Sequence, residues 1–258
     1  MGFQAFQGRM HSRSVALQST LEFGLDRILL GWVLIAALAC AGRIAVTSPP
    51  AADVALGAAM PYLLVMLAPV VSIALALRWF AGADARPQPT ARRAFPSRWR
   101  SLSPGEARSH PLYGTSGLMV SLLVGLLLNV VIRAAEFLAA IPPVFGRAPE
   151  WLSTLQVAMT FDAVLFTSLY AVAFVAALRR LPSFPRLLVA IWIGDIAMQL
   201  VIGHVVAASP HLPMPVAAAL HDLLLGNANK VLISVALWLP YLLLSARVNV
   251  TYRHRVPA

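Results

Sequence analysis

The chain has 258 residues, of which 59% are apolar and only 12% are charged, and its mean hydropathy is +0.77. Soluble domains carry about 25% charged residues, so this composition excludes a soluble globular protein and is typical of a membrane protein. The formal charge of +10 comes mainly from Arg residues that lie between apolar runs. No basic stripe interleaved with aromatic residues is present, and we therefore expect no nucleic-acid partner.

Five apolar runs are long enough, at a rise of about 1.5 Å per residue, to cross a hydrocarbon core about 30 Å thick. They are Ile28–Val46, Val54–Phe80, Gly117–Ile141, Leu155–Leu178 and Leu187–Ala208. A sixth run, Lys230–Ser245, is slightly short, and Pro215–Gly226 before it either lies on the outer surface or extends the helix beyond the bilayer. Pro61, Pro69 and Pro240 predict kinks, not helix ends. The predicted fold class is all-α: a polytopic membrane helical bundle of about six transmembrane helices.

The Lys and Arg residues gather on one side of this predicted bundle. Sixteen of the twenty fall in the N-terminal tail, in or beside the 81–110 loop, between the fourth and fifth runs, and after the sixth run. Arg43, Arg147 and Lys230 are predicted on the opposite side, and Arg133 lies inside a helix. Because basic residues concentrate in cytoplasmic loops, we predict that both termini are cytoplasmic and that the protein is a multi-pass protein of a bacterial inner membrane.

Residues 81–110 divide the chain. This segment is rich in Pro, Arg and Ser and lacks an apolar period, which predicts a flexible cytoplasmic connection. Residues 1–80 then form a tail and two helices, and residues 111–258 form a four-helix membrane module. The sequence at Arg98–Arg100 either only helps to set the topology or contacts anionic lipid headgroups.

No motif for a cofactor or a familiar catalytic centre is found. Cys40 is the only cysteine, so neither an internal disulfide nor a cysteine-based zinc site can form. The segment from Arg27 to Cys40 resembles a lipoprotein signal, but its apolar run continues through Val46 and predicts a retained helix. The chain has no Gly-x-Ser-x-Gly elbow, Gly-rich phosphate loop or His-Glu-x-x-His pair. We expect no cofactor and no enzymatic activity, although an intramembrane hydrolase using Glu136 or Asp162 stays an alternative.

Two short motifs carry a resemblance to a known family. The first is Pro-Leu-Tyr-Gly-Thr-Ser-Gly-Leu at Pro111–Leu118, and the second runs from Leu237 to Tyr252 and contains Pro-Tyr, Ser-Ala-Arg-Val and Thr-Tyr. Over about residues 110–256 the chain resembles the bacterial membrane family called domain of unknown function 2569. That family's first helix begins with Leu-Tyr-Gly-Ile-Gly-Gly-Trp-Leu. This chain differs from it in having Thr115-Ser116 in place of Ile-Gly and Leu118 in place of Trp. The resemblance implies a four-helix membrane module and no particular activity.

Several polar side chains lie inside apolar helices, where an unpaired charge costs several kcal/mol. The candidate site residues are Asn129, Arg133, Glu136, Asp162, Asp195 and Gln199, with His204 as a weaker member. On the third run Asn129, Arg133 and Glu136 share one face through i+4 and i+3 spacing, and Asp195 and Gln199 share a face on the fifth run. His204 lies off that face, near the outer rim. Two polar faces are therefore expected to meet inside the bundle.

This cluster has a structural and a functional interpretation. In the first, Arg133 pairs with Glu136 or with Asp162 and holds the helices together. In the second, three acids face one arginine, so that one carboxyl stays protonated and couples to proton movement. Asp195 is then the predicted coupling residue, because it is deepest and has no basic neighbour on its own helix.

The leading hypothesis is a non-catalytic accessory or assembly partner of a larger membrane complex, with the lipid bilayer and other integral membrane proteins as its partners. Ala163, Thr167 and Ala171 would allow close helix approach, within the bundle or onto a partner. The alternative is a small proton-coupled transporter or channel. A water-accessible cavity that reaches Asp195 would favour transport, whereas a dry, fully paired cluster would favour the accessory role. The sequence leaves the oligomeric state open.

Overall fold

The structure is a computed structural model, and it describes residues 16–17, 19–21, 24–47, 56–82, 99–145 and 148–257. Six helices are long and apolar enough to cross a membrane: α2 (Leu25–Thr47), α3 (Leu56–Trp79), α5 (Leu118–Ala140), α6 (Glu150–Leu178), α7 (Phe184–Ala207) and α8 (Met214–Leu244). In a bilayer each backbone N–H and C=O must be bonded within its own segment, which a helix achieves. The predicted all-α bundle is confirmed, and the chain is a multi-pass membrane protein.

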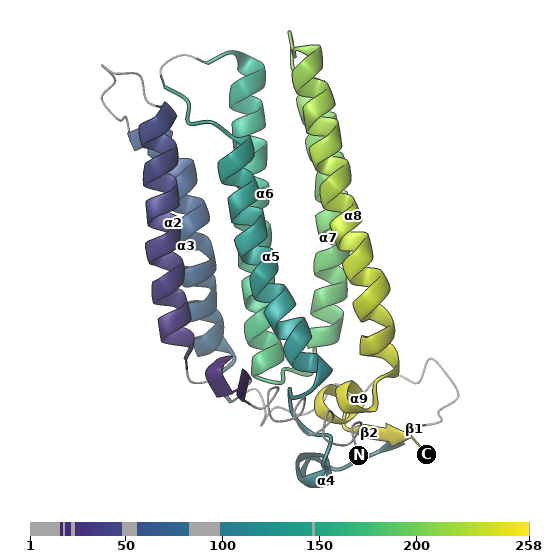
Figure 1. The fold of residues 1–258 in the computed structure, drawn as a ribbon. Coiled ribbons are helices and arrows are strands. Elements are labelled where there is room, and N and C mark those ends of the chain that lie inside the picture. Colours follow the sequence, from purple (N-terminus) through teal and green to yellow (C-terminus); the bar gives the residue numbers. More distant parts are fainter. Residues whose placement is uncertain are drawn as a thin grey trace, which may run out of the picture.

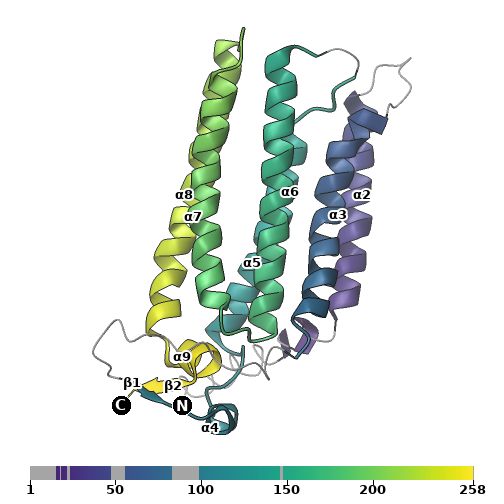
Figure 2. The same ribbon diagram turned by 180° about the vertical axis from the view of Figure 1, so that it is seen from behind.

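The helices form three hairpins in a row, α2 with α3, α5 with α6, and α7 with α8 (Figures 1 and 2). Helix α6 is central, because α3, α5 and α7 all pack against it. In its most apolar stretch 67% of the residues are buried, against 11% in α2 and in α8. Ala163, Thr167 and Ala171 are buried on α6, so their small side chains serve packing inside the bundle and not contact with a partner.

Helix α8 differs from the predicted sixth span. It begins at Met214, so that Pro215–Gly226 extends the helix. Of the two predicted alternatives, a surface segment or an extension of the helix, the structure shows the second. Its 31 residues span about 46 Å, well beyond the hydrocarbon thickness. Lys230, which the sequence analysis assigns to the outer side, lies close to the middle of this helix. The helix begins before the predicted apolar run because the polar residues around Gly226 interrupt the apolar run without interrupting the helix.

Three prolines lie inside helices without ending them: Pro61 and Pro69 in α3, and Pro240 in α8. The Trp32 indole N–H donates to the Met66 carbonyl at 2.9 Å, in the turn before Pro69. Such a bond satisfies backbone that a proline leaves weakly paired. It also ties α2 to α3.

The N-terminal hairpin docks on the rest of the bundle. The Tyr62 hydroxyl of α3 donates to the Ile141 carbonyl at 2.8 Å, and Arg43 of α2 donates to the Ala139 carbonyl at 3.3 Å. Both bonds satisfy carbonyls at the C-terminal end of α5, where no intrahelical donor remains. Helices α2 and α3 and the four-helix module therefore pack as one bundle.

A small cap closes the end of the bundle at which α8 finishes (Figure 1). Strand β1 (Trp99–Ser101) pairs antiparallel with β2 (Arg255–Pro257), and α4 (Pro104–Ser109) and α9 (Ala246–Arg253) complete the cap. The Arg255 guanidinium lies 5.0 Å from the centre of the Trp99 ring. The last part of the 81–110 segment is thus anchored to the C-terminus, a pairing that the sequence analysis does not anticipate. Residues 83–98, with Arg98, lie outside the described residues.

The two motifs behind the family resemblance meet in this cap. The Thr251 hydroxyl accepts a hydrogen bond from the Gly114 N–H at 3.1 Å and donates to the Gly114 carbonyl at 3.3 Å. Arg247 donates to the Ser116 hydroxyl at 2.7 Å. Gly117 precedes α5 with a φ of 71°, a left-handed conformation that favours glycine. The motifs are therefore two halves of one tertiary contact.

Candidate functional site

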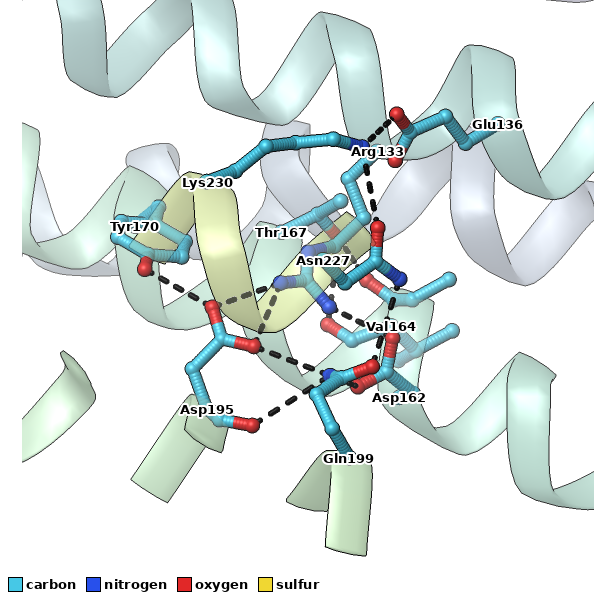
Figure 3. A network of polar contacts seen from close by, with 11 residues as sticks. Arg133, Glu136, Asp162, Val164, Thr167, Tyr170, Asp195, Gln199, Asn227 and Lys230 are labelled. Carbon is cyan, nitrogen blue, oxygen red and sulfur yellow. Dashed lines mark hydrogen bonds and ion pairs between the residues drawn. The ribbon is translucent and has the colours of Figure 1, made fainter. Parts of the chain in front are cut away.

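Arg133 lies at the centre of a charge cluster that joins three helices (Figure 3). From α5, its Nη1 contacts Asp162 Oδ2 on α6 at 2.6 Å, and its Nη2 contacts both carboxylate oxygens of Asp195 on α7, at 2.7 and 2.6 Å. The three residues are 9%, 2% and 0% exposed. The guanidinium also lies over the Phe166 ring, 5.0 Å from its centre. One cation thus bridges two carboxylates that are 33 residues apart in the sequence.

Neighbouring polar side chains complete the hydrogen bonding of both carboxylates. The Tyr170 hydroxyl donates to Asp195 Oδ2 at 2.9 Å. The Gln199 amide donates to Asp195 Oδ1 at 3.2 Å and to Asp162 Oδ1 at 3.3 Å. Asn227 of α8 in turn donates to the Gln199 side-chain oxygen at 3.4 Å. Every carboxylate oxygen of the two aspartates therefore has a donor, which is the condition for keeping charges in a buried site.

Glu136 has a different partner from the one that sequence spacing suggests. It pairs with Lys230 of α8 and not with Arg133, although Arg133 lies one turn away on the same helix. Lys230 also donates to Asn227 Oδ1 at 3.0 Å. The side chains of Lys230 and Glu136 are 48% and 34% exposed. Of the three predicted acids, Asp162 and Asp195 therefore face Arg133 in the buried cluster, whereas Glu136 pairs with Lys230 at its half-exposed edge.

Three members of the cluster are not among the predicted site residues. Tyr170 lies two helical turns after Asp162, and Asn227 and Lys230 lie three residues apart on α8, so each pair shares one helix face. The signal for the α8 pair is present in the sequence, but it can be recognised only if the helix begins near Met214. Starting the span at Lys230 places both residues at or outside its end.

Two predicted members are peripheral. Asn129 lies beside the cluster, and its side-chain oxygen is enclosed without a hydrogen-bond partner among the described residues. It borders a shallow pocket whose other lining residues are Ile132, Arg133, Glu136, Asn227, Lys230 and Val231. His204 is exposed on α7, and the described contacts include no bond between it and the cluster.

A second small pocket lies between α5, α6 and α8. Arg133, Glu136, Asp162 and Asn227 line it, and Asp195 does not. Asp162 is therefore the buried carboxylate that faces a pocket, whereas Asp195 is enclosed by Arg133 and by polar neighbours on α6 and α7. Within the part of the chain that the structure describes, no three His, Cys, Asp or Glu side chains are arranged so that they could hold a metal ion.

Comparison of this chain with protein-family models, with curated proteins and with solved structures finds no match. The resemblance to domain of unknown function 2569 therefore stays a prediction.

Proposed function

We propose that this protein is a non-catalytic subunit that binds another integral membrane protein through the outer face of α8. The support from the buried cluster is that Asp195 is enclosed and paired: it is 0% exposed and both of its oxygens accept from Arg133. Such a cluster stabilises the packing of helices and has no need of a transported ion. The interaction itself rests on an exposed polar side chain in an apolar helix.

The observation that supports this proposal is the exposed side-chain amide of Asn229. Asn229 is exposed on α8, about 22 Å from each end of the helix, and its amide has no hydrogen bond among the described residues. It lies on a stripe of exposed residues with i+3 and i+4 spacing: Ala218, Asp222, Leu225, Asn229, Leu232 and Ala236. An amide without a partner in hydrocarbon is costly, and Asn side chains hydrogen-bond between transmembrane helices. A helix of another membrane protein would satisfy it.

The test is purification of the tagged protein from its own membrane in a mild detergent, with quantitative mass spectrometry of stoichiometric partners. Asn229→Leu replaces the amide with an apolar side chain of similar size, so we expect a partner that binds the parent protein to be lost. Leu38→Met, on the exposed face of α2, is the matched control and should retain it. A parent protein that purifies alone, or a partner that Asn229→Leu retains in full, would contradict the proposal.

Proton-coupled transport is the second candidate, and one observation favours it. The interior has one more acid than it has bases, and Asp162 faces a pocket between α5 and α8. Asp162, and not Asp195, would then carry the proton. Proton flux into liposomes that contain the purified protein should be lost in Asp162→Asn, and an unchanged flux would rule this mechanism out.

A further inference from the structure

A cluster of arginines lies in the cap, away from the buried charges. Arg253 Nη1 and Arg255 Nε both donate to the same atom, Oδ1 of Asn249, at 2.9 and 2.7 Å. Asn249 is fully buried, and its amide N–H groups donate to the carbonyls of Leu243 and Ser245, at 3.2 and 2.9 Å. The Asn249 oxygen is therefore fixed in position, and it holds two guanidinium groups close together.

Arg186 supplies a third positive charge beside this pair. It is exposed on the first turn of α7, two residues after Phe184, whose ring lies 5.1 Å from that of Tyr252. Burial, and then the nearby charges of Arg255 and Arg186, lower the pKa of Arg253 from its usual value to about 10. The three arginines are thus close enough to repel one another.

No carboxylate offsets this repulsion within the described part of the chain. Arg186, Arg253 and Arg255 take part in none of the ion pairs found among the described residues. Asn249 is neutral, and each guanidinium keeps N–H groups that Asn249 does not use. Because α9 follows directly on α8, the last of the long apolar helices, the cluster lies just beyond the end of the apolar part of the bundle.

We propose that Arg186, Arg253 and Arg255 bind a phosphate group, either of an anionic lipid headgroup or of a soluble phosphate compound. Guanidinium groups match phosphate oxygens through paired N–H donors, and an anion between the three arginines removes their mutual repulsion. The site is independent of the proposed accessory role, since it lies in the cap and shares no residue with α8.

The experiment uses the full-length protein in a mild detergent. Native mass spectrometry measures its binding of phosphatidylglycerol and of phosphatidylcholine, and thermal unfolding compares inorganic phosphate with chloride at equal ionic strength. The double variant Arg253→Gln/Arg255→Gln keeps an amide donor toward Asn249. Arg27→Gln/Arg179→Gln removes two exposed charges at the same end of the bundle and is the matched control.

We expect the affinity for phosphatidylglycerol or for inorganic phosphate to fall about tenfold or more in the cluster variant and to change little in the control. If the cluster variant loses affinity for phosphatidylglycerol alone, the site binds a lipid headgroup. If it loses affinity for inorganic phosphate alone, the site binds a soluble ligand. Equal losses in both variants, or no preference for either anion over its comparator, would overturn the proposal. If the double variant fails to fold, Arg186→Gln is decisive, because Arg186 is exposed and its loss should still weaken binding.

Discussion

The two groups of charges inside the bundle use the same chemistry in opposite surroundings. The Arg133 guanidinium and its aspartates are at most 10% exposed, whereas Lys230 and Glu136 are 48% and 34% exposed. A buried charge loses its solvation and depends on each of its partners, whereas a half-exposed pair is less enclosed and depends less on its partner. The comparison teaches that the contribution of a charge to the stability of the bundle depends on its burial and its hydrogen bonds. Its location in an apolar helix does not by itself determine that contribution.

The two groups also connect different helices. Arg133 joins α5, α6 and α7 directly, in the middle of the bundle. Lys230 joins α5 to α8, the helix whose exposed stripe contains Asn229, near the two small pockets. We therefore expect substitutions of Arg133 to affect folding and substitutions of Lys230 to affect mainly the outer surface.

The largest expected effect is that of Arg133→Met. The substitution leaves Asp162 and Asp195 buried without their cation, and removing one partner of a buried ion pair costs about 3–5 kcal/mol. We expect a corresponding fall in the free energy of unfolding, measured by denaturant titration in mixed micelles. A loss below about 1 kcal/mol would show that the cluster does not stabilise the bundle.

A triple variant separates the loss of a cation from the loss of packing. Arg133→Met/Asp162→Leu/Asp195→Leu removes all three charges together, and apolar replacement of a buried ion network is often neutral or stabilising. We expect this variant to be more stable than Arg133→Met alone. If the triple variant is as unstable as Arg133→Met, the contribution of Arg133 to stability comes from the packing of its side chain and not from its charge.

The exposed pair should have a much smaller effect. Glu136→Gln/Lys230→Met is expected to lower the free energy of unfolding by less than Arg133→Met does, because Lys230 and Glu136 are 48% and 34% exposed and their charges are less enclosed than the buried cluster. The same denaturant titration measures it. A loss as large as that of Arg133→Met would mean that the pair is buried in the native assembly, which would strengthen the case for a partner at α8.

The smallest effect concerns pH and α4 in the cap. The Ser103 backbone N–H donates to the Glu106 carboxylate at 2.7 Å, and this bond and that of the Ser103 side chain hold the pKa of Glu106 below its usual 4.5. A lowered pKa means that this stabilisation is present above the usual pKa and is lost as the pH falls through the lower folded value. Hydrogen exchange of α4 amides, corrected for intrinsic rates, should therefore increase below about pH 4.5. Glu106→Gln is the control and should show no such step.

Local features of the sequence were enough to predict the spans and the charges within them. Hydropathy is a property of a single segment, so the six helices and the intramembrane positions of Arg133, Asp162 and Asp195 follow from it. Helix periodicity also placed Asp195 and Gln199 on one face, where both contact the cluster.

Only the tertiary structure decided the partners. Glu136 lies one turn from Arg133 yet pairs with Lys230, 94 residues away, because the rotation of α5 points the two side chains to different neighbours. The same holds in the cap, where Gly114 meets Thr251, 137 residues along the chain, and β1 meets β2. Such contacts depend on which helices are adjacent and how each is rotated about its axis. Those properties belong to the packed bundle, and no single segment encodes them.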